Sequence, residues 1–281
     1  MNLTSAIERN VAAALAEDLG DGDLTAQLLA PNQTASAFVI SREKAVLCGR
    51  GWFERCFSVL DKDVEIEWFA QDGDCIAPAQ MLCQIRGNAR AMLSAERPAL
   101  NFLQTLSGTA SVTCLYVEAI KGTQAVIMDT RKTLPGLRVA QKYAVKVGGG
   151  VNQRAGLFDG ILIKENHILA AGGIAQALAH ANKIAAPGIT IQIEVENLDE
   201  LGLALHAGAT LILLDNFSLP LLHEAVRITA NLATLEASGG VDLESVRAIA
   251  ETGVNRISVG GLTKHVHAVD LSMRFENEHS D

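Results

Sequence analysis

The sequence predicts an α/β fold whose C-terminal part is a β/α barrel of about six parallel strands. Hydrophobic residues make up 49% of the 281 residues but aromatic residues only 4%, which indicates a sizeable core of Ala, Leu, Val and Ile. From residue 124 onward, short apolar runs alternate with helical stretches rich in Ala and Leu. Three of these runs begin at an even spacing, at residues 190, 211 and 232. Such a period is typical of strand–helix units whose parallel strands are buried on both faces.

The first 110 residues mix helices and strands without such a period. We expect a helix at 2–18, strands at 37–41 and 45–48, a helix at 52–60, a strand at 64–69 and two short strands within 72–87. A further helix is expected to start near Ser94, which suits a helix cap, and to run to about residue 106. Gly108 is expected to interrupt it before a second helical stretch that reaches residue 120.

Six apolar runs are the predicted strands of the second part. They lie at 125–128, 160–163, 190–193, 211–214, 232–235 and 256–259. Six strand–helix units in succession favour a barrel over a doubly wound sheet. No GxGxxG pattern follows the first run, which weakens the alternative of a dinucleotide-binding domain.

Charge and composition exclude several classes of protein. The formal net charge is −9, whereas a non-specific nucleic-acid binder needs a basic surface. No apolar run approaches the ~18 residues that span a bilayer. Charges at Glu8, Arg9, Glu17 and Asp18 are unlike a signal peptide. The five cysteines are odd in number and form no CxxC pair, so we expect free thiols in a reducing cytoplasm.

Polar residues follow or end each predicted strand. They are Asp129 to Lys132, Lys164 to His167, Glu194 and Glu196, Asp215 and Asn216, Glu236 and Ser238, and Ser258. The carboxyl ends of barrel strands open onto one face, where active sites are built. The alternative, that polar residues merely mark where strands leave the core, explains any one strand end more easily than all six.

The types of residue at these strand ends indicate an anionic ligand. Arg131, Lys132 and Lys164 place cations beside the carboxylates of Glu194 and Asp215. Further along the chain, Arg138 and Lys142 are four residues apart and share a helix face, which is either a solvated stripe or an extension of the basic wall. The three glycines at 148–150 end that helix or turn the chain so that Arg154 reaches the same opening.

Two glycine turns predict a phosphate site. Ser238-Gly239-Gly240 and Ser258-Val259-Gly260-Gly261 each stand just ahead of a predicted helix. Glycines let backbone N–H groups approach a phosphate closely, and a helix N-terminus favours an anion. The carboxylates of Glu194 and Asp215 are expected between these turns and the cations. They could stabilise a ribosyl cation or hold a metal on pyrophosphate. These residues predict a phosphosugar enzyme with an anionic second substrate.

Several stretches, in order along essentially the whole chain, resemble the quinolinate phosphoribosyltransferase family. They are EDLG at 17–20, ERPALNF at 96–102, DTRKTLPGLR at 129–138, KYAV at 142–145, GGG at 148–150, LIKENH at 162–167, LLDNF at 213–217 and ISVGGLTKH at 257–265.

The resemblance implies an N-terminal α/β sandwich domain at 1–110, completed by 266–281, and an open β/α barrel at 111–265. It implies a pentosyltransferase, a nicotinate-nucleotide diphosphorylase (carboxylating). Such an enzyme transfers phosphoribosyl from phosphoribosyl pyrophosphate to quinolinate, and gives nicotinate mononucleotide, pyrophosphate and CO₂ in NAD biosynthesis. It also implies Mg²⁺ as cofactor and a cytoplasmic homodimer with active sites shared between subunits, without nucleic acid or membrane as partners.

The resemblance also assigns roles to residues. Lys132, Lys164, Glu194 and Asp215 are expected to be catalytic, and Glu194 and Asp215 to hold the metal directly or through pyrophosphate or water. The expected substrate-binding residues are Arg97, supplied by a second subunit, and Arg131, Lys132, Arg138, Gln153, Arg154 and Lys164. The expected phosphate-binding residues are Ser238, Gly239, Gly240, Ser258, Gly260 and Gly261.

Two positions depart from the family pattern. Gln153 stands where the family usually has His, and Gln192 stands where it usually has Glu. Strand alternation puts Gln192 on the same face as Glu194, and it is expected lower in the barrel. Two alternatives stay open: a paralogue of the same fold, such as the molybdenum-transport-associated branch, that acts on another base, and a non-catalytic barrel that binds a phosphosugar. His265 and His267 leave a metal site open as a further alternative.

Overall fold

The computed structural model describes residues 2–276, which form two compact units. Unit 1 contains residues 2–114, 134–149 and 265–276, and unit 2 contains residues 115–133 and 150–264. The segment 134–149, which the sequence places in the barrel domain, packs in unit 1. The chain therefore leaves unit 2 after its first strand and returns to it before the second.

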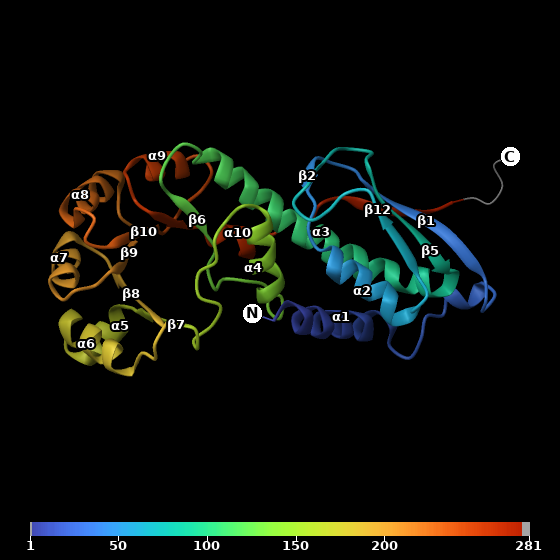
Figure 1. Cartoon of the computed structure of the whole chain (residues 1–281), viewed down its shortest axis with the longest axis horizontal. Coiled ribbons are helices and arrows are strands. Elements are labelled where there is room, and N and C mark those ends of the chain that lie inside the picture. The colour runs from blue at the N-terminus through green and yellow to red at the C-terminus, as the bar shows by residue number, and fades with distance from the viewer. Residues whose placement is uncertain (1, 277–281) are drawn as a thin grey trace. The chain divides into compact units, whose positions relative to one another are not determined.

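The sheet of unit 1 has four strands and is antiparallel (Figure 1). Its order is β12 (Leu271–Phe275), β1 (Thr34–Ser41), β5 (Met81–Asn88) and β3 (Glu65–Trp68), and a separate pair joins β2 (Ala45–Val46) to β4 (Cys75–Ile76). The C-terminal strand β12 completes the sheet, with Phe275 opposite Ala37. The expected tail continues to residue 281, and 277–281 lie outside the described residues.

Four helices and a short 3₁₀ turn, η1 (Ala26–Leu28), complete the elements of unit 1. The helices are α1 (Leu3–Leu19), α2 (Arg50–Leu60), α3 (Ala89–Ala119), which continues into unit 2, and α4 (Arg138–Val147). Asn2 caps α1 by accepting the backbone N–H of Ser5 at 3.1 Å. The few aromatic residues gather in this core, where Trp52, Phe53 and Phe57 are fully buried. This apolar packing fixes α2 and α3 against the sheet.

One long helix, α3, replaces the two helical stretches expected around Gly108. The helix has 31 residues, begins directly after β5 rather than near Ser94, and contains both Pro98 and Gly108. A Cβ atom at Gly108 would lie 2.0 Å from the carbonyl oxygen of His267. The glycine therefore allows the chain before β12 to approach the helix, and the expectation that it ends the helix was wrong.

The sheet of unit 2 has six parallel strands, as the sequence predicts. In sheet order they are β6 (Val126–Met128), β11 (Arg256–Ser258), β10 (Thr234–Ser238), β9 (Leu211–Asp215), β8 (Thr190–Val195) and β7 (Gly160–Ile163). β6 and β7 are the two edges of the sheet, so the barrel is open between them. β10 begins two residues later than expected, because Ala230 and Asn231 adopt positive φ angles of 46° and 66° in the preceding turn.

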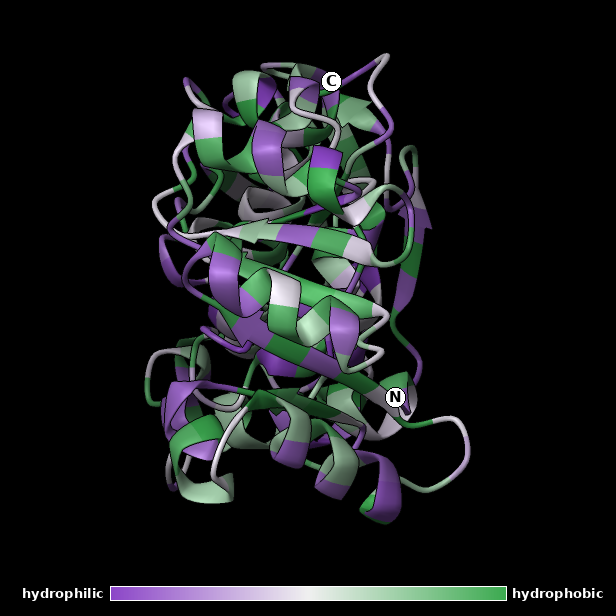
Figure 2. Cartoon of the chain, turned by 90° about the vertical axis from the view of Figure 1, so that its left-hand side faces the viewer, coloured by the Kyte–Doolittle hydropathy of each residue, from purple (hydrophilic) through white to green (hydrophobic). Residues whose placement is uncertain are grey.

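Helices connect the strands and lie around the outside of the sheet (Figure 1). They are α5 (Glu165–Ala171), α6 (Ile174–Ile184), α7 (Leu198–His206), α8 (Leu219–Thr229), α9 (Val246–Glu251) and the short α10 (Gly261–Lys264). Figure 2 shows hydrophilic and hydrophobic residues side by side on the helices, as expected for helices with one buried face. No helix in residues 2–276 is long and apolar enough to cross a membrane.

A short segment at 151–154 lies at the open side of the barrel. The N–H of Val151 donates to the carbonyl of Ile127 at 2.8 Å, and the N–H of Asp129 donates to the carbonyl of Val151 at 3.2 Å. The segment thus follows β6 for one residue without forming a strand, and it carries Gln153 and Arg154 to the site described next.

Candidate active site

The carboxyl ends of the parallel strands of unit 2 bring most of the predicted polar residues to one edge of the sheet. Asp215 at the end of β9 is paired in register with Ser238 at the end of β10. Lys164 directly follows β7, and Glu194 lies on the neighbouring strand β8. Because the strands run in the same direction, their ends form one polar rim.

An ion pair joins two of the strand ends. Nζ of Lys164 lies 2.9 Å from Oε2 and 3.1 Å from Oε1 of Glu194. The Glu194 side chain is only 10% exposed, whereas that of Lys164 is 45% exposed. The carboxylate thus lies in the wall of the barrel and holds an ammonium group that still reaches solvent and any ligand there.

Asp215 is held by its neighbour, Asn216, a residue at the predicted strand end for which no role was expected. Nδ2 of Asn216 donates to Oδ2 of Asp215 at 2.8 Å, and the N–H of Asn216 donates to the carbonyl of Ser238 at 2.9 Å. Asn216 has a positive φ of 56°, a conformation that Asn tolerates better than most residues. An Asp-Asn pair at the end of an apolar strand was the available signal.

Two arginines of unit 2 lie close enough to influence each other. Burial lowers the pKa of the Arg154 guanidinium, and the positive charge of Arg131 lowers it further, against an opposing contribution from Asp159. Nη1 of Arg154 donates to the carbonyl of Gly160 at 2.9 Å, which fixes the direction of the side chain. Two neighbouring guanidinium groups create a positive potential that favours a ligand with negative charges.

Lys132 lies over the second glycine turn. The hydroxyl of Thr263 donates to the carbonyl of Lys132 at 2.7 Å and holds its backbone beside that turn. A Cβ atom at Gly260 would lie 3.3 Å from Cδ of Lys132. Gly260 therefore leaves room for the lysine stem, whatever ligand binds the turn.

The first glycine turn requires glycine at residue 239 because of a contact within the protein. Gly239 has a φ of +101°, and a Cβ atom there would lie 2.0 Å from Oδ1 of Asn216. Gly240 has a φ of +59°, with open space where a Cβ would be. The next helix, α9, begins only at Val246, so the expectation of a helix directly after this turn was wrong. The helix after Gly260 begins at Gly261 but has only four residues.

Ser258 faces the interior rather than the turn that it precedes. It is 5% exposed, and its hydroxyl donates to Oε1 of Glu236, which is fully buried. The Ser258 hydroxyl is therefore engaged with Glu236, and phosphate binding by Ser258 stays a prediction. The residue alternates with Ile257 on a short strand, and its inward position was not visible from the glycines that follow it.

Gln153 and Gln192 also contact each other inside the barrel. Nε2 of Gln153 lies 2.8 Å from Oε1 of Gln192, and Nε2 of Gln192 lies 2.9 Å from Oε2 of Glu236. Gln192 is buried, as its expected low position in the barrel requires. Gln153, expected to bind substrate, directs its amide to this interior group.

Three predicted residues belong to unit 1. Arg97 lies on α3, where its side chain is 59% exposed and 3.9 Å from Glu96. Arg138 and Lys142 lie on α4, where Arg138 is partly buried and Lys142 is fully buried. Burial of Lys142 excludes the alternative of a fully solvated stripe.

The described residues contain no group of three or more His, Cys, Asp or Glu side chains arranged to hold a metal ion. His265 and His267, the alternative metal pair, are both exposed between α10 and β12. Glu194 and Asp215 remain as candidates for a metal that arrives with other ligands.

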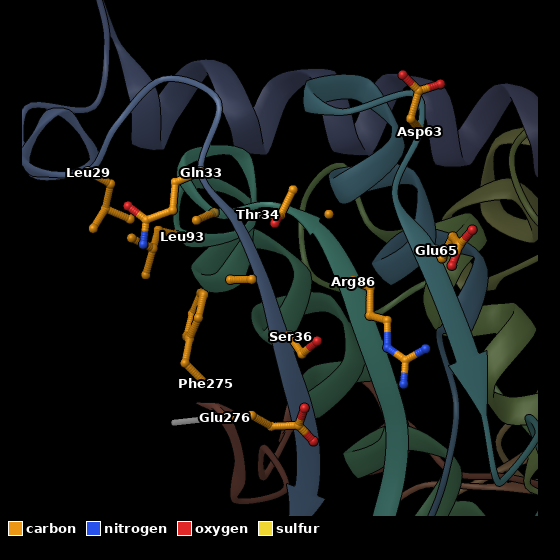
Figure 3. Close-up of a pocket in the computed structure, with 13 residues that line it drawn as sticks. Leu29, Gln33, Thr34, Ser36, Asp63, Glu65, Arg86, Leu93, Phe275 and Glu276 are labelled. Atoms are coloured by element: carbon orange, nitrogen blue, oxygen red, sulfur yellow. The ribbon is translucent and has the colours of Figure 1, made fainter. Parts of the chain in front are cut away.

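A cavity of about 750 Å³ lies in unit 1 and contains none of the predicted site residues. Figure 3 shows Leu29, Leu93 and Phe275 on one side of it and Glu65 and Arg86 on the other. Its polar groups have mixed charge, so it lacks the concentration of cations found at the rim of unit 2.

Comparison with known proteins assigns both parts of the chain to one family description. The family model described as quinolinate phosphoribosyl transferase, N-terminal domain, matches residues 23–107, and the model of the C-terminal domain matches residues 109–274. A relative from Bacillus subtilis (strain 168), named "Probable nicotinate-nucleotide pyrophosphorylase [carboxylating]", is 42% identical over 92% of this chain and 89% of its own length. A "Nicotinate-nucleotide pyrophosphorylase [carboxylating]" from Mycobacterium leprae (strain TN) is 42% identical over 92% of this chain and 94% of its own.

A solved structure is similar over nearly the whole chain. The nicotinate-nucleotide pyrophosphorylase from Francisella tularensis superimposes with a TM-score of 0.95 at 45% sequence identity, and the match covers 98% of each chain. The similarity therefore extends over both units and includes every strand end described above.

Proposed function

The chain belongs to the quinolinate phosphoribosyltransferase family, and from this premise we propose how the rim of unit 2 carries out the reaction. It is a pentosyltransferase, a nicotinate-nucleotide pyrophosphorylase of the carboxylating type. It transfers phosphoribosyl from phosphoribosyl pyrophosphate to quinolinate and releases pyrophosphate and CO₂. The product, nicotinate mononucleotide, feeds NAD biosynthesis.

Arg131 and Arg154 bind the two adjacent carboxylates of quinolinate. The observation that carries this assignment is that the Arg154 side chain is fixed on the carbonyl of Gly160 at 2.9 Å. Burial lowers the pKa of Arg154, and the nearby charge of Arg131 lowers it further. A dianion relieves that repulsion, and planar guanidinium groups suit carboxylates because they can donate two parallel hydrogen bonds. Lys132 adds a third cation at the same rim.

Glu194 and Asp215 stabilise the positive charge that develops on the ribose as pyrophosphate leaves. Both carboxylates are fixed before the substrate arrives, Glu194 by Lys164 and Asp215 by Asn216. Fixed charges need little rearrangement during the reaction, which is how electrostatic preorganisation lowers a barrier. The half-exposed ammonium of Lys164 lies where it can also contact the pyrophosphate oxygens.

Decarboxylation follows from the first bond formed. When the ring nitrogen attacks C1 of the ribose, that nitrogen becomes cationic. The C2 carboxylate then leaves as CO₂, and the electron pair that remains on C2 is stabilised by the adjacent cation until it takes up a proton. The arginines hold the ring in place during both steps, so orientation contributes more than a general acid.

The two glycine turns bind the 5′-phosphate of phosphoribosyl pyrophosphate. Ser238, Gly239 and Gly240 form one turn, and Gly260 and Gly261 form the other. Backbone N–H groups supply the hydrogen bonds, because glycine lets a phosphate approach the main chain closely.

Glu194 and Asp215 are proposed to hold Mg²⁺ together with the pyrophosphate group of phosphoribosyl pyrophosphate. Mg²⁺ sites in phosphate-transferring enzymes use one or two carboxylates, substrate phosphates and waters. Glu194 and Asp215 fit that donor set, whereas a site made only of protein ligands would need more carboxylates than this rim offers. When bound, the metal neutralises charge on the departing pyrophosphate, and Asp215 would contact it directly or through water.

We also propose a cytoplasmic homodimer in which Arg97 of one subunit completes the site of the other. Leu157, Phe158 and Ile184 are between 75% and 81% exposed near the edge strand β7. A groove of about 350 Å³ beside this strand includes Leu157 and Ile184 in its lining. Large exposed apolar side chains of this kind favour coverage by another chain. None of the five cysteines forms a disulfide within the described residues, which suits a reducing compartment.

A turnover assay tests the proposed function. Purified protein with phosphoribosyl pyrophosphate, Mg²⁺ and quinolinate should form nicotinate mononucleotide and CO₂. Nicotinate should be a poor substrate, because it lacks the carboxylate that leaves and that one arginine would bind. Turnover of another base in place of quinolinate would favour a paralogue, and binding of phosphoribosyl pyrophosphate without any turnover would favour a non-catalytic barrel.

A further inference from the structure

A line of hydrogen bonds crosses the inside of the barrel. The Ser258 hydroxyl on β11 donates to one carboxylate oxygen of Glu236 on β10, and Nε2 of Gln192 on β8 donates to the other at 2.9 Å. Nε2 of Gln153 donates in turn to Oε1 of Gln192 at 2.8 Å. We call these four side chains the polar relay.

Within residues 2–276, no Lys, Arg or His side chain forms an ion pair with the carboxylate of the polar relay. Glu236 is fully buried, and both side chains that donate hydrogen bonds to it are neutral. Burial of a carboxylate without a counter-charge is costly. If residue 236 served only to fill the barrel, a neutral amide could make the same contacts at a lower free-energy cost of burial. The charge of Glu236 therefore indicates a further role.

The charge fixes the direction of every hydrogen bond in the polar relay. A carboxylate only accepts hydrogen bonds, so Gln192 must present its NH₂ group to Glu236 and its carbonyl oxygen to Gln153. Gln153 must then donate from its own NH₂ group, which leaves its Oε1 as an acceptor. That oxygen accepts the backbone N–H of Arg154 at 3.0 Å.

The polar relay therefore ends on the backbone of a substrate-binding residue. The segment 151–154 lies outside the six strands, and its conformation depends on contacts such as the bond from the N–H of Gln153 to Oδ1 of Asp129 at 2.8 Å. The Arg154 side chain is anchored separately on the carbonyl of Gly160. With the peptide held by Gln153 and the guanidinium held by Gly160, Arg154 is aligned before quinolinate binds.

We propose that Glu236 is a positioning residue for Arg154, acting through the orientation of the Gln192 and Gln153 amides. The inference rests on the proposed role of Arg154 in binding quinolinate. It predicts that the charge at residue 236, rather than its size, sets the affinity for quinolinate and leaves the affinity for phosphoribosyl pyrophosphate unchanged.

The test replaces the charge and keeps the shape. Glu236→Gln should weaken quinolinate binding, measured by calorimetry, by about 10-fold, as expected for loss of charge-assisted hydrogen bonds. Binding of phosphoribosyl pyrophosphate should stay within about 2-fold of wild type, since none of its proposed ligands is altered. Glu224→Gln, which alters a solvent-exposed glutamate on α8, is the matched control and should change neither affinity.

A second variant tests the polar relay without removing Glu236. Gln153→Met keeps the length of the side chain but removes the amide that joins Gln192 to the backbone N–H of Arg154. It should weaken quinolinate binding by about as much as Glu236→Gln and leave phosphoribosyl pyrophosphate binding within about 2-fold of wild type. In the double variant the two losses should not add, because both changes interrupt the same line of hydrogen bonds.

The outcomes separate this inference from the proposed function. If the wild-type protein does not bind quinolinate, the proposed function fails. If the wild type binds and folded Glu236→Gln binds equally well, or loses affinity for both substrates alike, the positioning role is wrong. If Glu236→Gln does not fold, an unchanged quinolinate affinity in folded Gln153→Met overturns the inference in its place.

Discussion

The barrel of unit 2 carries two layers of polar side chains that differ in what surrounds them. The outer layer lies at the strand ends, where Lys132 is exposed and Lys164 and Asp215 are half-buried. The inner layer contains Gln192, Glu236 and Ser258, which are buried and bonded to one another. Both layers come from polar residues near the ends of apolar runs. Position at a strand end therefore identifies the site but does not show which side chains face the ligand.

The two glycine turns repeat this difference on a smaller scale. Ser238 lies half-buried at the rim, whereas Ser258 belongs to the inner layer. Gly239 must be glycine because Asn216 occupies the space beside it, whereas Gly260 has only a flexible lysine stem at 3.3 Å. The two turns have similar sequences but differ in whether they tolerate a side chain at the glycine. Variants at Gly239 and Gly260 can therefore separate effects on protein packing from effects on phosphate binding.

The prediction with the largest expected effect, complete loss of activity, tests whether a second chain completes the outer layer. Arg97→Ala and Lys132→Ala should each be inactive, because each removes a proposed substrate ligand. Mixed under conditions of subunit exchange, the two variants should recover activity, since some sites then take each wild-type residue from a different chain. Steady-state turnover of the mixture measures this. Absence of recovery after exchange has been verified by mass would mean that one chain supplies the whole outer layer.

The next effect tests the charge of the outer layer within one chain. Lys164→Met should lower kcat by about 100-fold or more, as for loss of a preorganised electrostatic contact to the transition state. The melting temperature should also fall, because Glu194 is only 10% exposed and loses its cation, so kcat is measured well below the unfolding transition. Lys121→Met, at a lysine 76% exposed and 3.2 Å from Glu118, is the matched control. A similar loss in the control would mean that the effect is not specific to the site.

A smaller effect should separate the two glycine turns. Gly239→Ala should weaken phosphoribosyl pyrophosphate binding strongly and lower the melting temperature, because both its φ of +101° and Asn216 oppose a side chain. Gly260→Ala should fold normally, since Lys132 can move by a few tenths of an ångström, and Gly260→Val should weaken that binding by about 10-fold through lost phosphate hydrogen bonds. Titrations of the folded variants measure the affinities. Unchanged affinity in Gly260→Val would place the phosphate elsewhere.

The sequence predicted the strands of the barrel because apolar runs bounded by polar residues report burial directly. It could not predict the role of Gly108, since the residue serves a contact with His267, which is distant in sequence. Nor could it show that the segment 134–149 packs with unit 1, because a local pattern contains no information on which core a helix joins.

The candidate site shows the same limit. The rim residues followed from strand ends and from charge, whereas the inward direction of Ser258 depends on its partner Glu236, which lies on another strand. Asn216 was passed over for a similar reason. Asn216 holds Asp215 and occupies the space beside Gly239, and its place next to Asp215 at a strand end indicated the first contact but not the second.

The smallest expected effect concerns Gln153, which connects the two layers. Its amide donates to Gln192 and accepts the N–H of Arg154, so both ends of the side chain are engaged with protein. Neither Gln153 nor Gln192 titrates near neutral pH. Quinolinate affinity of the wild type should therefore vary little between about pH 6 and 8, where a histidine at this position would change its charge.

Gln153→His separates direct substrate contact from an inner-layer role. If residue 153 touched quinolinate, the imidazolium would strengthen binding below its pKa, where the proton is present, by a few-fold in a partly solvated site. The structure favours a different result. The protonated ring has two N–H donors and no acceptor, so it cannot accept the N–H of Arg154 and would no longer hold the backbone of that arginine. We therefore expect affinity to fall slightly at pH 6 relative to the wild type. Calorimetry at pH 6 and 8 shows whether the variant binds quinolinate more tightly or more weakly than the wild type. Stronger binding at pH 6 would mean that residue 153 contacts the substrate and belongs to the outer layer.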